Sequence, residues 1–396
     1  MAQAEKYPVL AFNEATTGPV LSHAEEIDAL RAEHPFVRST HGDGFWVFTD
    51  ADLIRDALQH PGVFSSTVVT VHDPDPPYKW IPEMLDPPEH TVWRQLLAPH
   101  FAPRAMERLE DRVRERCVSL LREIAGTGHC DFLRDFAWRF PTTIFMELMG
   151  MPDDGLEQFL TWEHQILHPA AGDDPERAGA FDAMVAVMGY FTELMEEKRR
   201  SPGDDLLSAA LEWRIEGLPI PHEDLLSWCL LMFMAGLDTV SIQLAYAFWH
   251  LATHPADRRQ IVEDAAVVPA AVEEFLRQFA FVAPSRKVMS DTDFHGCPLR
   301  KGDMVFAPLC GATRDPAVFG NDAATVRFDR EVNNHIAFGA GPHRCLGSHL
   351  ARRELRVALE EWHRFIPSYG LTPGVEVTEH GGGLFGIDRL ELSWDV

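Results

Sequence analysis

The sequence predicts a mainly α-helical protein with small β-sheets near both ends, folded as one large domain over residues 1–396. Apolar residues recur at helical spacing in three long stretches, residues 104–125, 177–200 and 224–252. Residues 36–50 alternate around a Gly-Asp-Gly turn, which indicates a β-hairpin. Residues 381–396 indicate short strands after a glycine-rich bend. Because no repeat, low-complexity tract or linker divides the chain, we expect a single domain.

The composition is that of an ordinary soluble globular protein, with 46% hydrophobic and 24% charged residues. Its 35 Lys and Arg against 61 Asp and Glu give a formal net charge of −26. This charge repels phosphate backbones and anionic lipid surfaces, so we expect neither nucleic acid nor a membrane as a partner. The most apolar run, Leu225–Leu237, is too short to span a bilayer and indicates a buried helix.

The six cysteines lie far apart and form no Cys-x-x-Cys pair. In a chain of this length that spacing indicates reduced thiols and a cytoplasmic protein. The first twenty residues have neither the basic nor the apolar region of a signal peptide, which agrees with that location.

One cysteine, Cys345, lies in the loop FGAGPHRCLG (338–347), directly before the strongly helical stretch 348–362. A thiol at the start of a helix meets unsatisfied backbone N–H groups and the positive end of the helix dipole, and both favour thiolate. The loop glycines at 339, 341 and 347 let a flat group approach the backbone closely. A thiolate that faces a flat open space suits an axial haem ligand, with His343 and Arg344 near a propionate.

The residues around Cys345 leave other roles open. On chemistry alone a buried structural cysteine is the commoner role for a single thiol. A zinc site is less favoured, since the only other candidate ligands at short spacing are His343 and His349.

The pattern F-G-x-G-x-H-x-C-x-G resembles the haem-binding signature of the cytochrome P450 superfamily, and every fixed position is present. The resemblance implies the fold of that family, with haem b held between a long central helix and the cysteine loop. It makes Cys345 the thiolate ligand of the iron. It also assigns these residues to haem binding: Phe338, Gly339, Gly341, His343 and Gly347 in the loop, and His90, Arg94 and Arg286 outside it.

Two further motifs match the same family. Glu274 and Arg277 in EFLR match its structural E-x-x-R pair, and Arg327 in VRFD is the best match for the additional arginine of that cluster. The stretch MAGLDTV resembles the oxygen-activating motif. That resemblance implies that Gly236 leaves room for dioxygen and that Asp238 and Thr239 deliver protons. Without the resemblance, Thr239 is expected to bond to a carbonyl one turn earlier, with Asp238 facing solvent.

Within the superfamily the chain is most similar to the camphor-hydroxylating bacterial group. Tyr78 stands where that group has a tyrosine that binds the substrate ketone, whereas Glu83, Met234 and Gly383 differ from it. The expected substrate contacts are Tyr78, Leu231, Met234, Val282 and Leu384. Whether Glu83 faces the pocket is open at this stage.

We therefore expect a soluble bacterial-type haem-thiolate monooxygenase that uses O2 to hydroxylate a small hydrophobic substrate, such as a monoterpenoid or norisoprenoid ketone. No flavin or nicotinamide fingerprint is visible, so electrons are expected from a [2Fe–2S] ferredoxin and its NAD(P)H-dependent reductase. Arg94, Arg352 and Arg353 are the expected docking residues. The alternatives are a peroxide-driven haem-thiolate enzyme, a non-catalytic haem sensor, and a metal-free helical binding protein with a structural Cys345.

Overall fold

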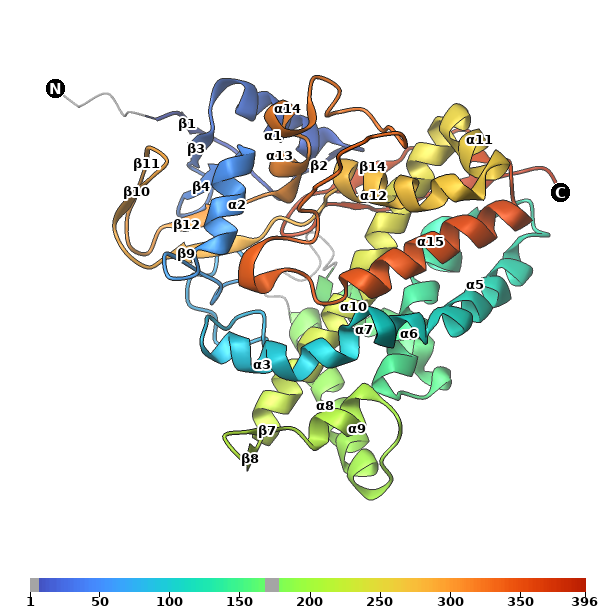
Figure 1. The fold of residues 1–396 in the computed structure, drawn as a ribbon, viewed down its shortest axis with the longest axis horizontal. Coiled ribbons are helices and arrows are strands. Elements are labelled where there is room, and N and C mark those ends of the chain that lie inside the picture. The colour runs from blue at the N-terminus through green and yellow to red at the C-terminus, as the bar shows by residue number, and fades with distance from the viewer. Residues whose placement is uncertain (1–6, 168–177) are drawn as a thin grey trace.

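The computed structural model describes residues 7–167 and 178–396, which form a mainly helical fold (Figure 1). The predicted stretch 177–200 begins one residue outside the described part of the chain. The α-helices are α1 (Ser22–Glu33), α2 (Ala51–Gln59), α3 (Glu89–Leu97), α4 (Pro103–Glu107), α5 (Glu110–Ile124), α6 (Arg139–Met149), α7 (Leu156–Leu167), α8 (Ala178–Arg200), α9 (Leu206–Leu211), α10 (His222–Thr253), α11 (Pro255–Glu263), α12 (Val268–Gln278), α13 (Leu309–Thr313), α14 (Pro316–Phe319) and α15 (Ser348–Phe365).

The strands form one six-stranded sheet and several small ones. The larger sheet has the order β1 (Val9–Leu10), β3 (Phe36–Ser39), β4 (Phe45–Phe48), β12 (Met304–Phe306), β9 (Ser285–Val288) and β5 (Phe64–Ser65). Two small sheets have two strands each: β10 (Thr292–Phe294) with β11 (Cys297–Leu299), and β7 (Arg214–Ile215) with β8 (Leu218–Pro219). Two others have three strands each, in the orders β13 (Gly370–Leu371), β16 (Glu391–Ser393), β6 (His129–Asp131) and β15 (Gly386–Ile387), β14 (Thr378–His380), β2 (Thr17–Pro19).

The sheets confirm the two predicted β regions. Strands β3 and β4 pair in antiparallel register from Phe36↔Phe48 to Ser39↔Phe45 around the expected turn. Near the C-terminus, β15 and β16 are the expected short strands, and β14 directly precedes the predicted range. The N-terminal segment contributes a strand to two sheets: β1 pairs with β3 in the six-stranded sheet, and β2 pairs with β14 in the C-terminal sheet.

Helix α10 is the long central helix. In Figure 1 it runs diagonally through the middle of the molecule and passes behind one end of α15. The apolar residues of α10 lie on nearly all of its faces, as expected for a helix buried in a core. By length and composition it could cross a membrane, but 67% of its most apolar window is buried inside the protein. It therefore resembles the core helix of a globular fold more than a membrane span.

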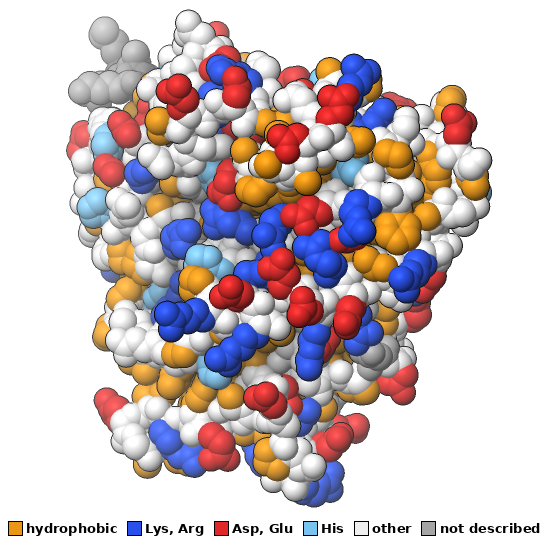
Figure 2. Space-filling view, turned by 45° about the vertical axis from the view of Figure 1, so that its right-hand side comes forward, with side chains coloured by type: hydrophobic (Ala, Val, Ile, Leu, Met, Phe, Trp, Pro, Cys, Tyr) orange, Lys and Arg blue, Asp and Glu red, His pale blue; other side chains and the backbone are white. Residues whose placement is uncertain are grey.

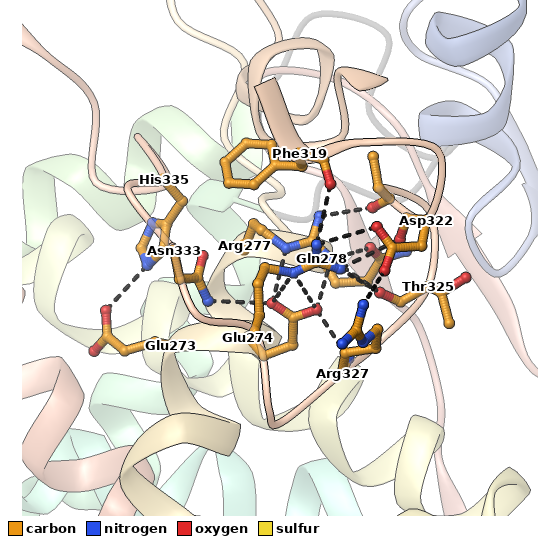
Figure 3. A network of polar contacts seen from close by, with 12 residues as sticks. Glu273, Glu274, Arg277, Gln278, Phe319, Asp322, Thr325, Arg327, Asn333 and His335 are labelled. Carbon is orange, nitrogen blue, oxygen red and sulfur yellow. Dashed lines mark hydrogen bonds and ion pairs between the residues drawn. The ribbon is translucent and has the colours of Figure 1, made fainter. Parts of the chain in front are cut away.

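A buried ion-pair cluster fixes the segment that leads to the cysteine loop (Figure 3). Arg277 forms a two-pronged pair with Glu274, with Nε–Oε2 and Nη2–Oε1 distances of 2.8 and 2.7 Å. Both side chains are almost fully buried, at 0% and 1% exposure. Arg277 also donates to the carbonyl oxygens of Thr313, Ala323 and Thr325. Since a buried charge needs partners, these bonds explain why the pair can exist in the core.

The expected third arginine of this cluster was Arg327, and the structure corrects that prediction. The Arg327 side chain is 45% exposed and pairs with Asp322 and Asp329, while only its backbone N–H reaches Glu274. Arg330 completes the cluster instead: its Nε lies 3.2 Å from both carboxylate oxygens of Glu274, and its side chain is 8% exposed. The chain is irregular here, so the direction of a side chain does not follow from spacing.

Candidate active site

The cysteine loop precedes α15 and bends as its glycines require. Gly339 and Gly341 have φ values of 74° and 69°, in the left-handed region that favours glycine. A Cβ on Gly341 would stand 2.3 Å from the carbonyl oxygen of Leu58, so no other residue fits there. The loop closes on itself through the Cys345 N–H, which donates to the carbonyl oxygen of Phe338 at 2.8 Å.

Cys345 differs from every other cysteine of the chain, because it is exposed and the other five are buried. The surrounding protein nevertheless desolvates the thiol and raises its pKa, whereas the Gly347 N–H, Arg94 and Arg344 favour the thiolate. Its position directly before α15 adds the helix dipole to these groups. An accessible sulfur with cations and an N–H beside it is suited to binding a metal ion.

A cluster of histidine and arginine side chains lies next to this loop. The rings of His90 and His343 are 4.0 Å apart, and Arg94 donates to the Arg344 carbonyl oxygen at 2.7 Å. Burial lowers the pKa of His90 to about 4, and the charges of His343 and Arg94 lower it further. Burial also lowers the pKa of Arg286. Helix α3, strand β9 and the cysteine loop thus bring the four predicted propionate partners together.

His343 shows that this cluster has spare hydrogen-bonding capacity. Its side chain is 5% exposed, yet neither ring nitrogen has a hydrogen-bond partner among the described residues. Leaving a buried polar group unsatisfied costs about 1–3 kcal/mol, so such groups are normally paired. An anionic group placed here, such as a haem propionate, satisfies them.

Glu83 also faces this cluster. Its Oε2 lies 3.9 Å from His343 Nδ1. Burial raises the pKa of the Glu83 carboxyl, but the nearby side chains of His343, Arg286 and His90 outweigh burial, and the pKa is lowered. Glu83 therefore contributes a negative charge at the edge of the haem-binding region.

One stripe of α10 is not covered by protein. Leu231, Ala235 and Thr239 are four residues apart and are half-buried or exposed, although most of their neighbours on the helix are buried. The Thr239 hydroxyl donates to the Ala235 carbonyl oxygen at 3.0 Å, the bond to the preceding turn that local chemistry predicts. The stripe presents a small residue and a hydroxyl to the open side of the helix.

The structure gives the surroundings of two further residues of α10. A Cβ on Gly236 would stand 2.3 Å from the Phe145 ring, so the missing side chain makes room for Phe145 of α6. Ala235 is the small residue on the open stripe. Asp238 does not face solvent, because it is buried at 1% exposure.

Glu163 of α7 is a buried acidic neighbour of Asp238 that the sequence analysis did not identify. It is buried, and burial together with the nearby charge of Asp238 raises its pKa well above the usual range. Two acidic side chains from helices α7 and α10 therefore interact inside the protein, and Glu163 holds its proton tightly. No spacing motif links positions 163 and 238, so the sequence offered no signal for this pair.

Of the expected substrate contacts, Val282 and Leu384 form an antiparallel bridge and are half-buried. Leu231 belongs to the open stripe, and the half-buried Tyr78 ring stacks on Trp80 at 5.3 Å. Met234 is different, since it is buried in a core cluster with Phe233 and Leu237 and lies off the stripe.

The arginines expected at a docking surface are held by acidic partners. Arg352 forms a two-pronged pair with Glu273, at 2.6 and 2.9 Å, and covers the Phe338 ring. Arg353 pairs with Glu110 of α5. Figure 2, which brings the right-hand side of Figure 1 forward, shows Lys and Arg side chains in a band with Asp and Glu among them. The face is therefore mixed in charge, although the chain as a whole is strongly acidic.

The fold and the site define a haem-thiolate protein, because an accessible cysteine precedes a helix, arginine and histidine donors lie beside it, and the long central helix has an open stripe with one hydroxyl. The sequence model of the cytochrome P450 family matches residues 36–362, and the chain belongs to that family. Its cofactor is haem b, and it is a monooxygenase of the bacterial type.

Individual relatives agree with this assignment. "Probable cytochrome P450 127A1" of Sinorhizobium fredii is 34% identical over 360 residues, which cover 89% of this chain and 84% of the relative. The vitamin D(3) 25-hydroxylase of Pseudonocardia autotrophica is 32% identical over 357 residues, or 88% and 87% of the two chains. The solved structure of CYP101J2 has a TM-score of 0.90 at 29% identity and covers 100% of both chains. CYP101C1 reaches 0.89 at 30% identity, over 100% of this chain and 99% of the other.

Proposed function

We propose that this cytochrome P450 hydroxylates a small, mostly hydrocarbon ketone, of the size of a monoterpenoid or norisoprenoid, with electrons from a [2Fe–2S] ferredoxin. The observation that carries the proposal is the adjacent pair Asp238 and Thr239 in the central helix, with Asp238 buried and the Thr239 hydroxyl on the open stripe. A carboxylate is expensive to bury, and beside a hydroxyl it has a use where protons must reach a reacting oxygen. A peroxide-driven enzyme, the main alternative, does not need it.

In this proposal the haem supplies the activation of dioxygen, and the chain supplies position and protons. Cys345 holds the iron, while His90, Arg94, Arg286 and His343 hold the two propionates. Thr239 positions a proton on the open stripe of α10, and the buried side chains of Asp238 and Glu163 lie behind it.

The proposed substrate class is inferred from the aromatic residues of the loop 66–88 and from the aliphatic residues expected to contact the substrate. Tyr78 and Trp80 are stacked, which makes a rigid aromatic cover with one hydroxyl. Leu231, Val282 and Leu384 are aliphatic. A pocket of this kind obtains most of its affinity from apolar contact and its orientation from a single hydrogen bond. The relatives named above do not choose a substrate, since one of them is named for a vitamin D.

The proposal of a ferredoxin as electron donor is based on the face of the protein that carries α15. Arg352 and Arg353 are held in place by Glu273 and Glu110, so their guanidinium groups are positioned before a partner arrives. Arg94 lies beside the cysteine loop. An acidic ferredoxin is the expected partner, because charges on an interface rim act mainly on the rate of association. We also propose a cytoplasmic location, where such a donor is available.

The test is turnover of ketones such as camphor and ionone under ¹⁸O2. With NADH, a ferredoxin and its reductase we expect a hydroxylated product that carries one ¹⁸O atom. Product formation with hydrogen peroxide alone, at a rate equal to or above that with ferredoxin, supports the peroxide-driven alternative. Stable CO binding without turnover of any ketone supports the sensor.

Tyr78→Phe tests the ketone anchor. Removing one neutral hydrogen bond is worth roughly 0.5–1.5 kcal/mol, so binding should weaken only several-fold. The position of hydroxylation should change more than the rate, because apolar contacts still hold the substrate but no longer select one orientation. The measurement is the ratio of regioisomers, with Tyr190→Phe as control since Tyr190 packs against Phe159 and Phe191. Identical ratios and dissociation constants in Tyr78→Phe and the wild type show that Tyr78 only packs.

A further inference from the structure

A second cluster of ligand-type side chains lies away from the haem site. Glu14 comes from the segment between β1 and β2, His41 from the β3–β4 turn, and His72 from the loop 66–88. One carboxylate oxygen and one nitrogen from each imidazole all lie within 4.8 Å of one another. In residues 7–167 and 178–396 this is the one group of three such side chains that meets this criterion.

Glu14 is the buried member of this cluster. Its side chain is 5% exposed, and Oε1 lies 2.5 Å from His72 Nε2. The other oxygen, Oε2, is buried without a hydrogen-bond partner among the described residues. A buried carboxylate oxygen without a donor is costly, and a bound cation removes that cost.

The two histidines are accessible and are held in place. His41 and His72 are both exposed, so an ion can reach them from solvent. Their rings meet edge to face at 5.5 Å, and Phe45 contacts His72 at 5.7 Å with its ring perpendicular. Gly42 has a φ of 57°, and a Cβ there would stand 2.9 Å from His72 Nδ1. The turn that carries His41 therefore lies directly against the His72 ring.

The donor set selects a class of ion. Ca²⁺ and Mg²⁺ take oxygen ligands, whereas two imidazoles and one carboxylate suit Zn²⁺ and related divalent ions. Three protein ligands leave one position of a tetrahedral ion for water, and the exposed side of this cluster admits it. We propose that Glu14, His41 and His72 bind a divalent transition-metal ion of the Zn²⁺ class.

The ion would connect the loop that carries His72 to two segments, those of Glu14 and His41, which the β1–β3 pairing already holds next to each other. The loop is 66–88, which also carries Tyr78 and Glu83. The two segments belong to the sheet region through β1 and the β3–β4 hairpin. Metal binding should therefore restrain the loop that covers the substrate side of the haem site. This step rests on the proposed function only for the role of Tyr78; the ion site itself does not depend on it.

The test is calorimetric titration of the chelator-treated, haem-loaded protein, without a polyhistidine tag, with ZnCl2. We expect one site in the wild type, and a loss of at least tenfold in affinity in His41→Ala, His72→Ala and Glu14→Gln, since even outer-shell groups of metal sites are worth roughly 10–100-fold. His41→Ala is decisive because an exposed turn residue can be replaced without disturbing the core. His295→Ala is the matched control: His295 contacts Asp56 at 2.8 Å, also at the surface, but outside the cluster.

Limited trypsin digestion gives a readout that is independent of haem chemistry. Zn²⁺ should slow cleavage after Lys79 in the loop 66–88 of the wild type and of His295→Ala, but not of His41→Ala. If wild type and His41→Ala bind Zn²⁺ equally, the ion is adventitious and the proposal fails. The proposal also fails if the wild type binds none, and the proposed hydroxylation is untouched in either case.

Discussion

Cys345→Ser abolishes the thiolate-type spectrum of the reduced CO complex and all monooxygenase turnover. The sulfur is accessible and has the Gly347 N–H and Arg94 beside it, while the other five cysteines are buried. A serine hydroxyl in the same place stays protonated, since nothing in the loop is strong enough to ionise an alcohol, and it is a hard, weak ligand for this iron. The backbone bend of the loop depends on Gly339 and Gly341, so the fold should survive the change.

The measurement is the Soret band of the reduced, CO-bound protein together with product formation. Cys297→Ala is the matched control, because Cys297 is buried in β11 and is not part of the loop. A thiolate-type band that persists in Cys345→Ser contradicts the assignment of the iron ligand. It would return Cys345 to the structural role that its chemistry alone left open.

The sequence predicts best what is encoded locally. The cysteine loop is specified by glycines at fixed positions and by the helix that follows, and the structure has the bend and the helix start where expected. The apolar run that predicts a buried central helix and the alternation that predicts the β3–β4 hairpin are local in the same sense. These features depend on backbone geometry and periodicity, which short stretches of sequence determine.

Side-chain direction in irregular segments is where the prediction failed. Arg327 and Arg330 are only three residues apart in the chain. The Arg327 side chain is 45% exposed and pairs with acidic residues at the surface, whereas the Arg330 side chain is 8% exposed and joins the buried cluster around Glu274. The neighbour of Gly236 could not be predicted either, because its missing side chain makes room for Phe145, a ring contributed by another helix. Both outcomes depend on tertiary neighbours that no single stretch of the chain contains.

Clusters assembled from distant segments were also out of reach. Glu163 and Asp238 come from different helices, and Glu14, His41 and His72 follow no ligand spacing. The sequence did mark Glu83 as a departure from the camphor-hydroxylating group, and the structure shows its carboxylate against His343. The departure from the family pattern thus identified Glu83 as an unusual residue, but it did not predict which side chains Glu83 contacts.

Thr239→Ala is expected to separate oxygen consumption from product formation. The Thr239 hydroxyl lies on the open stripe of α10 and bonds to the Ala235 carbonyl oxygen at 3.0 Å. Behind it Asp238 is buried, and next to Asp238 lies Glu163, whose raised pKa keeps that carboxyl protonated. Alanine keeps the helix, since it is the best helix former, but removes the one hydroxyl that can donate on this stripe.

Losing a positioned proton-transfer group costs typically ~10²–10⁴-fold, and bound water replaces part of the effect. We therefore expect the product formed per NADH consumed to fall by roughly tenfold or more, with the missing electrons recovered as hydrogen peroxide. Substrate binding should be unchanged, because the hydroxyl adds little to an apolar contact. The bond to Ala235 is equally a structural feature, so stability alone cannot distinguish the two roles.

Thr239→Ser distinguishes them. Serine restores the hydroxyl but not the methyl group, so coupling of NADH to product should return toward the wild-type value, while any effect due to the lost methyl packing should persist. The measurements are product, peroxide and NADH in the same reaction, together with the melting temperature of each variant. If Thr239→Ala lowers the melting temperature but leaves product per NADH unchanged, the hydroxyl only caps a carbonyl, and the proton must reach the site by a path that does not include Thr239.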